Sequence, residues 1–249
     1  SMHFQFWILN SIEIRINELD KKQKRLEKMI EEREGMEVAG IVDIGYHERI
    51  SDIKNEFDVI IDYSHPDNLD KIYEYEINEA KPLVIATTGY TSEQISQIEE
   101  IAKTAPVVYT ANFSLGITVM EHILEETAPI LKDSFDIEII EKHHNKKLDA
   151  PSGTAKMLAD AMNKDGEFNY IYGRSGETKR GKEIGIHAVR GGNIAGEHSV
   201  IFAGEDEILE IRHSAGSRKI FAAGAIKAAN FILKRKNGLY SMGDVLFGR

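Results

Sequence analysis

The chain has 249 residues, of which 42% are hydrophobic, and its formal net charge is −10. This length and this composition exclude a largely disordered chain and allow one large domain or two modest ones. The acidic balance argues against sequence-independent nucleic-acid binding, which needs a basic face, and no apolar run approaches the roughly 20 residues that span a bilayer.

The N-terminal segment shows no basic stretch followed by an apolar run and a small-residue cleavage site, and the chain contains no cysteine. We therefore expect no secretory signal, no disulfides and a cytoplasmic location. The alternating residues Ile12, Ile14 and Ile16 predict a strand with one wet face. Apolar residues at helical spacing predict a helix over about 18–34 that stops near Gly35.

Apolar runs of strand length then alternate with helical stretches. Strands are predicted at 38–42, 59–61, 83–86 and 107–109, with helices at 68–78 and 92–102. This alternation predicts an α/β fold with a Rossmann-like parallel sheet, in which ligands bind beyond the carboxyl ends of the strands. Polar residues follow several of these strands, namely Asp43, Ser64-His65, Thr87-Thr88-Gly89 and Asn112-Phe113-Ser114.

The pattern changes after Ser114. A helix is predicted over 116–132, and strands separated by glycine-rich turns follow at 137–141, 184–189, 197–202 and 208–213. This succession indicates a smaller α+β domain with a mixed sheet. We expect a first domain over 1–113 and a second over 114–219, with the alanine-rich helix near 220–233 returning to the first, which 220–249 completes.

The densest chemical signal lies in residues 141–156. Ser152 or Asp149 can cap a helix that begins near Thr154, and backbone N–H groups at a helix start attract a carboxylate or a phosphate. Lys147 adds a positive charge, and either histidine of the pair His143-His144 can supply a proton near neutral pH. These residues predict a site for a small anion that becomes protonated.

A purely structural interpretation of the same residues stays open. The histidine pair could simply end a strand, Lys146-Lys147 could form a solvated turn, and Ser152-Gly153-Thr154 could only cap a helix. Metal binding by the two histidines is disfavoured, because adjacent side chains on a strand point apart and no third ligand is near in sequence.

The run E-K-H-H-N-K-K-L-D-A-P-S-G-T-A at 141–155 resembles the signature of the dihydrodipicolinate reductases, also called 4-hydroxy-tetrahydrodipicolinate reductases. Other segments are similar to the same family, and the resemblance covers about residues 36–249. These segments are D-Y-S-H-P at 62–66, A-T-T-G-Y at 86–90, A-N-F-S at 111–114, V-R-G-G-N-I-A-G-E-H at 189–198 and H-S-A-G-S-R at 213–218.

The resemblance implies an oxidoreductase of lysine and diaminopimelate biosynthesis that transfers hydride from NADH or NADPH to a cyclic dicarboxylate, with a proton from the enzyme and loss of water. It implies that His143 is the general acid and that Lys147 acts with it. Residues that hold the substrate carboxylates are implied at His144, Ser152, Gly153 and Thr154. Arg218 could reach a carboxylate or form a salt bridge within its loop.

On the nucleotide side, the resemblance implies that Asp43 accepts the ribose hydroxyls, and the following Ile44 favours NADH. Two strand-end segments would contact the nicotinamide half, namely Thr87, Thr88 and Gly89, and Thr110, Ala111, Asn112 and Phe113. The resemblance further implies a homotetramer built through the sheet of the second domain.

One segment departs from the family. The glycine-rich turn G-x-x-G-x-M-G that approaches the pyrophosphate should lie near 17–23, where this chain reads N-E-L-D-K-K-Q, and no glycine precedes Gly35. Glu18 and Asp20 would repel phosphate, which Lys21 and Lys22 would partly offset. Three explanations stay open: a diverged N-terminus that still binds cofactor, a damaged reading frame, or a non-catalytic dicarboxylate-binding or regulatory relative.

Overall fold

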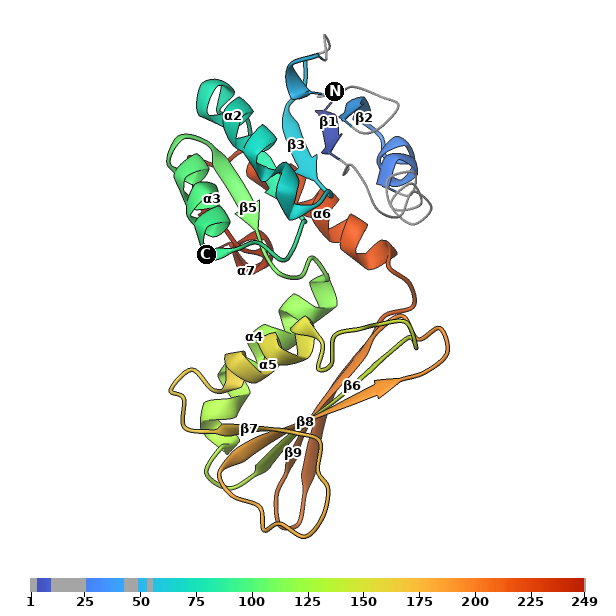
Figure 1. The fold of residues 1–249 in the computed structure, drawn as a ribbon, viewed down its shortest axis with the longest axis vertical. Coiled ribbons are helices and arrows are strands. Elements are labelled where there is room, and N and C mark those ends of the chain that lie inside the picture. The colour runs from blue at the N-terminus through green and yellow to red at the C-terminus, as the bar shows by residue number, and fades with distance from the viewer. Residues whose placement is uncertain (1–3, 10–25, 43–48, 53–55, 249) are drawn as a thin grey trace. The chain divides into compact units, whose positions relative to one another are not determined.

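The computed structural model describes residues 4–9, 26–42, 49–52 and 56–248. The chain divides into two compact units, Ser1–Phe113 with Phe221–Arg249, and Ser114–Ile220. Each unit has its own sheet (Figure 1). Among the described residues, no helix is both long enough and apolar enough to cross a membrane.

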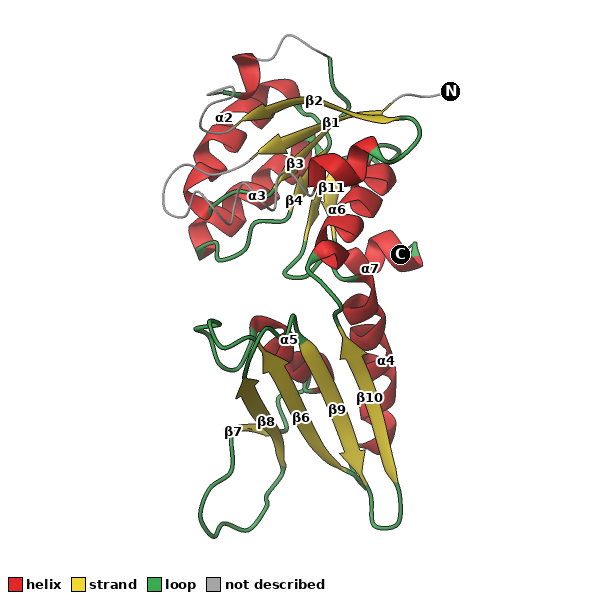
Figure 2. Ribbon diagram, turned by 90° about the vertical axis from the view of Figure 1, so that its right-hand side faces the viewer, coloured by secondary structure: helices red, strands yellow, loops and turns green. Residues whose placement is uncertain are grey.

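The first unit contains a parallel sheet of six strands in the order β11-β5-β4-β3-β1-β2. Helices α2 and α3 lie on one side of it and α6 on the other (Figure 2). Its elements are β1 (Phe4–Leu9), β2 (Met36–Val42), η1 (Ile50–Asp52), β3 (Val59–Asp62), η2 (Pro66–Asn68), α2 (Leu69–Glu79), β4 (Leu83–Ile85), α3 (Ser92–Thr104), β5 (Pro106–Tyr109), α6 (Lys219–Ile232), β11 (Gly238–Tyr240) and α7 (Met242–Phe247).

The central strands of this sheet are buried on both faces. All residues of β3 and β4 are buried, as expected for parallel strands covered by helices on both sides. The chain runs from β1 outward to β2 and then returns to the other side of β1 as β3. This reversal of strand order creates a switch point between β1 and β3, where open α/β sheets bind their ligands.

The second unit contains a mixed sheet of five strands in the order β10-β9-β6-β8-β7. Strand β6 runs parallel to β8 and antiparallel to β9. The elements are α4 (Leu115–Leu131), β6 (Asp136–His143), α5 (Gly153–Met162), β7 (Asn169–Tyr172), β8 (Glu183–Arg190), β9 (Glu197–Ala203) and β10 (Ile208–Ser214).

Helices cover only one of the two faces of this mixed sheet. Strand β6 alternates, with Ile137, Ile139 and Glu141 buried, and helices α4 and α5 lie on one face of the sheet (Figure 2). The two isoleucines belong to a core that includes residues of both helices. Ile140 and Ile201 point to the other face, which no helix of this fully described unit covers.

The predicted fold class is confirmed, and most predicted elements are found within a few residues of their expected bounds. The prediction missed β1, β7, β11 and α7. The strand expected over 12–16 lies outside the described residues, as does the first part of the helix expected over 18–34; residues 26–31 of that helix are helical.

A close backbone contact joins α6 to the end of the loop after β5. Gly224, in the middle of α6, lies so near Phe113 that a Cβ atom there would overlap the Phe113 carbonyl oxygen. Glycine normally weakens a helix interior, so its position here is explained by this close approach. The contact anchors the segment 110–113 to the first unit.

We predict that Gly224→Ala destabilises the protein by about 3 kcal/mol, because the helix and the Phe113 carbonyl must move apart. Urea unfolding measures the change. Gly181→Ala is the matched control, since the atom nearest to its Cβ would be a flexible carboxylate oxygen at 3.7 Å. Equal unfolding midpoints for the two variants would refute the steric explanation.

Candidate functional site

The site in the second unit is built around the end of β6. His143 is the last residue of this strand, and its side chain is 12% exposed. Glu141 lies two residues earlier and therefore on the same face, where its carboxylate is fully buried. The His143 Nδ1 atom lies 2.6 Å from Glu141 Oε2, a short charge-assisted hydrogen bond.

The Glu141 carboxylate accepts from two further residues that are distant in sequence. Arg190, at the end of β8, donates from Nη2 to Oε1 and from Nη1 to Oε2, each at 2.8 Å. The backbone N–H of Ser152 donates to Oε1 at 2.9 Å. Burial by itself raises the pKa of Glu141, but the hydrogen bonds from Arg190, His143 and Ser152 outweigh it, and the pKa lies below its ordinary value.

Helix α5 begins beside this carboxylate. Ser152, one of the two predicted candidates, is its N-cap, and the Ser152 hydroxyl accepts from the N–H of Ala155. Gly153 is exposed, with open space where a Cβ would lie, and Thr154 is half-buried in the same turn. The first turn of α5 thus presents an accessible positive dipole end next to the His143–Glu141 pair.

Two residues that the sequence interpretation missed complete the surroundings of His143. The ring of His198, on β9, meets the His143 ring edge-on with centroids 5.2 Å apart, and His198 Nε2 lies 3.2 Å from the Ser152 hydroxyl. Gly196 has φ = +153°, and a Cβ there would lie 3.2 Å from His143 Nε2. A side chain at 196 would therefore crowd the outward nitrogen of His143.

The predicted cationic residues lie in the loop after β6 and near α6. Lys147 Nζ is 2.8 Å from the Asp149 carboxylate, and the Asp149 carbonyl accepts from Arg190 Nη2 at 2.5 Å. Arg218 Nη2 lies 2.9 Å from His144 Nε2, so Arg218 contacts a second predicted residue. The second unit thus brings together all of its predicted residues around one end of its sheet.

The described residues that were predicted to bind nucleotide lie in the first unit, at the carboxyl ends of its parallel strands. Thr87, Thr88 and Gly89 follow β4, and residues 110–113 follow β5. Asp62, the buried last residue of β3, accepts from the Ser64 N–H and from the Tyr90 hydroxyl, each at 3.0 Å. Burial raises the pKa of Asp62, and the hydrogen bonds from Ser64 and Tyr90 partly offset this rise. Asp43 lies outside the described residues.

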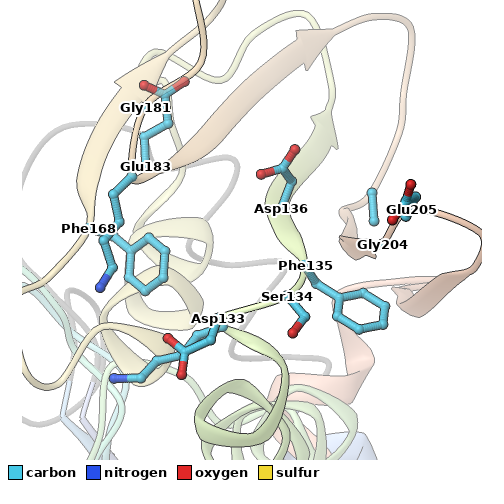
Figure 3. A pocket seen from close by; sticks show the side chains of 12 residues that line it. Asp133, Ser134, Phe135, Asp136, Phe168, Gly181, Glu183, Gly204 and Glu205 are labelled. Carbon is cyan, nitrogen blue, oxygen red and sulfur yellow. The ribbon is translucent and has the colours of Figure 1, made fainter.

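A separate pocket of about 370 Å³ opens at the other end of β6 (Figure 3). It contains none of the predicted site residues. Its lining comprises Lys132, Asp133, Ser134, Phe135, Asp136, Phe168, Gly181, Lys182, Glu183, Ala203, Gly204 and Glu205. Within the described part of the chain, no three histidine, aspartate or glutamate side chains gather as a metal site.

The sequence interpretation assigned no role to Glu141, Arg190 or His198, although all three lie in the segments that resemble the family. A signal for Glu141 was the strand alternation, which puts a carboxylate on the face of His143 two residues before it. Arg190 and His198 meet the site only through the pairing of β6 with β8 and β9, in which Glu141 lies opposite Ala188 and His198. That register is not visible in a single sequence.

Comparisons with known proteins agree with one another. Family models described as "Dihydrodipicolinate reductase, N-terminus" and "Dihydrodipicolinate reductase, C-terminus" match residues 14–113 and 116–246. The chain is 48% identical over 204 residues to the 4-hydroxy-tetrahydrodipicolinate reductase of Clostridium novyi (strain NT), covering 80% of each chain. It is 45% identical over 237 residues to that of Caldanaerobacter subterraneus subsp. tengcongensis, covering 91% of this chain and 94% of the relative.

A solved structure supports the fold. The dipicolinate-bound dihydrodipicolinate reductase from Paenisporosarcina sp. TG-14 matches with a TM-score of 0.74 at 24% identity, and the match covers 98% of this chain and 99% of that one.

We predict that His198 makes stability depend on pH. Burial, with smaller contributions from nearby charges, lowers the pKa of His198 from 6.5 to about 4. Above pH 6.5 the residue is neutral in both states, but as the pH falls from 6.5 towards 4 the unfolded chain takes up a proton that the folded chain does not. At pH 5 this costs the folded state about 2 kcal/mol relative to pH 7.5.

Urea unfolding of the wild type and of His198→Gln at pH 7.5 and pH 5 measures this cost. The variant should lose less stability between the two pH values, because a glutamine side chain does not titrate. The buried carboxyls of Asp62 and Glu76 titrate in both proteins and cancel in the comparison. Identical pH dependence in the two proteins would show that His198 is not kept neutral by the fold.

Proposed function

Because the chain belongs to the dihydrodipicolinate reductase family, we propose that it catalyses the NAD(P)H-dependent reduction of 4-hydroxy-tetrahydrodipicolinate to tetrahydrodipicolinate in lysine and diaminopimelate biosynthesis. The observation that carries the proposal is the His143–Glu141 pair beside the start of α5. A proton donor and an anion-holding helix start therefore lie next to each other, as the reduction of a dicarboxylate requires.

His143 is the proposed general acid. Its Nδ1 is engaged by Glu141, whereas Nε2 faces Gly196 and carries no side-chain obstruction there. The N–H bond at Nε2 breaks as the proton passes to the substrate, and the electron pair stays on the nitrogen. Lys147 is the second proposed catalytic residue, and its salt bridge to Asp149 holds it in the loop before α5.

The substrate carboxylates are negatively charged, and the groups proposed to hold them are dipolar or basic. Ser152, Gly153 and Thr154 form the start of α5, where N–H groups and the helix dipole favour an anion. The paired side chains of His144 and Arg218 supply further donors. A planar guanidinium suits a carboxylate because it can donate two parallel hydrogen bonds.

The nucleotide, NADH or NADPH, would supply the hydride. The described residues fit it in one respect: the segments after β4 and β5, with Thr87, Thr88, Gly89 and residues 110–113, follow strand ends close to the switch point of the sheet. In this proposal these segments contact the nicotinamide half and Asp43 accepts the ribose hydroxyls. The pair Asp43-Ile44 favours NADH.

The two units divide these tasks in the proposal. The first, over 1–113 and completed by the C-terminal helices, binds the dinucleotide, and the second binds substrate and forms a homotetramer. The support for assembly is the sheet face with Ile140 and Ile201, which no helix of its unit covers. We place the enzyme in the cytoplasm, as the cysteine-free sequence suggests.

The function is tested by calorimetric titration of NADH and NADPH, with and without pyridine-2,6-dicarboxylate as a substrate mimic, together with a turnover assay. We expect micromolar cofactor binding and turnover. Mimic binding without nucleotide binding or turnover would instead identify a dicarboxylate-binding relative that has lost the reaction.

His143→Ala should reduce turnover by about 10²- to 10⁴-fold, because the general acid is lost, while the affinity for the mimic changes little. Steady-state kinetics and calorimetry measure the two effects. His122→Ala, on α4 of the same unit, is the control and should retain activity. Full activity of His143→Ala would remove His143 from the mechanism.

Ile201→Asp should break the homotetramer, because assembly would bury an unpaired carboxylate on the uncovered sheet face. Light scattering coupled to gel filtration gives the mass. Ile130→Asp, on a side chain of α4 that is 78% exposed, is the control and should leave the mass unchanged. A tetramer that survives Ile201→Asp would place the interface elsewhere.

A further inference from the structure

The hydrogen bonds at Glu141 saturate its carboxylate. Oε1 accepts from Ser152 N at 2.9 Å and Arg190 Nη2 at 2.8 Å, and Oε2 accepts from His143 Nδ1 at 2.6 Å and Arg190 Nη1 at 2.8 Å. Four donors thus meet the four lone-pair sites of an ionised carboxylate. A carboxylate with no exposure needs this full set, since each unmet bond in the interior is costly.

Only one of these four donors can change its role. The guanidinium of Arg190 and the backbone N–H of Ser152 donate and never accept. A neutral histidine carries its proton on either ring nitrogen, and the hydrogen bond at one nitrogen decides which. The Glu141 carboxylate, which can only accept, therefore determines where the proton of His143 resides.

We propose that Glu141, held ionised and aligned by Arg190, is the positioning residue that keeps the proton of neutral His143 on Nδ1 and so reserves Nε2 for proton transfer. This inference rests on the proposed function of His143 as general acid. In the protonated ring both nitrogens carry protons, and Glu141 retains the one on Nδ1. The proton on Nε2, beside Gly196, is the one that leaves.

Arg190 has a second contact that extends its role. Its Nη2 donates at 2.5 Å to the carbonyl of Asp149, whose carboxylate pairs with Lys147. One guanidinium thus holds the carboxylate behind His143 and the residue that pairs with Lys147. It therefore fixes both proposed catalytic side chains relative to β8.

Besides Glu141, titratable side chains near His143 come from β9, β10 and the loop before α5. His198 faces it from β9, and charges on Lys147, before α5, and on His213, from β10, act on His198 in turn. Burial is the main cause that lowers the pKa of His198 to about 4, so His198 stays neutral near pH 7. Glu141 is therefore the charged side chain in direct hydrogen-bond contact with His143.

The test is the ring tautomer of His143 in the full-length protein, read from nitrogen chemical shifts of ¹⁵N-labelled histidine and assigned by comparison with His143→Ala. The wild type should show neutral His143 with its proton on Nδ1. A proton on Nε2 in the wild type would overturn the inference without any further variant.

Glu141→Gln supplies the second measurement. A glutamine amide has one oxygen that accepts and one NH₂ group that donates, so its NH₂ group must face one of the two pairs of donors. Among these donors, only His143 can become an acceptor. The proton of neutral His143 should therefore move to Nε2. The alkaline limb of the kcat/KM profile should shift to lower pH, and kcat should fall about 10²-fold with little change in KM.

Glu138→Gln is the matched control. Glu138 lies on the same strand but on the opposite face, where its Oε2 is 2.6 Å from His187 Nε2 and its Oε1 accepts from Arg174 and Arg180. The control should leave the His143 tautomer unchanged. An activity loss in Glu141→Gln with the tautomer and the pH limb unmoved would show that Glu141 is only structural. A tautomer switch in a protein whose wild type has no turnover would uphold the positioning role and refute the proposed function.

Discussion

The buried carboxylate of Glu141 is the constraint on which the second unit depends. It has no exposed surface, and its charge is balanced by donors from three elements: β6 itself, Arg190 on β8 and the start of α5. An ionised group in this position is tolerated only while all its partners remain. The register of β6 with β8 and the entry point of α5 are therefore fixed by the same set of bonds that support His143.

Two histidines in edge-to-face contact would repel each other if both carried a proton. Their ring centroids are 5.2 Å apart, and burial lowers the pKa of His198 to about 4. The ionised Glu141 contacts His143 directly, whereas the ring of His198 contacts the neutral Ser152 hydroxyl. The environment thus divides the pair into one histidine beside an anion and one that stays neutral near pH 7.

Periodicity predicted the elements whose apolar pattern is strong and local. The apolar runs between glycine-rich turns at 184–189 and 197–202 and the helical stretch over 92–102 needed no tertiary information, and the motif at 141–155 indicated the candidate site. Strand β7 was missed because its residues are exposed or half-buried and carry little apolar signal. The role of Arg190 was hidden because it meets Glu141 across 49 residues of chain, through a strand pairing that local sequence does not encode.

The two units support their proposed ligands by different physical means. In the proposed enzyme, the substrate side in the second unit depends on the specific side chains of Glu141, His143 and Arg190. In the first unit the described nucleotide segments follow strand ends, where contact depends more on backbone than on side-chain identity. The segment after β1, residues 10–25, lies outside the described residues and contains no glycine. In the proposed enzyme, the departure at the N-terminus therefore affects how tightly the nucleotide is held, while proton transfer depends on contacts made entirely within the other unit.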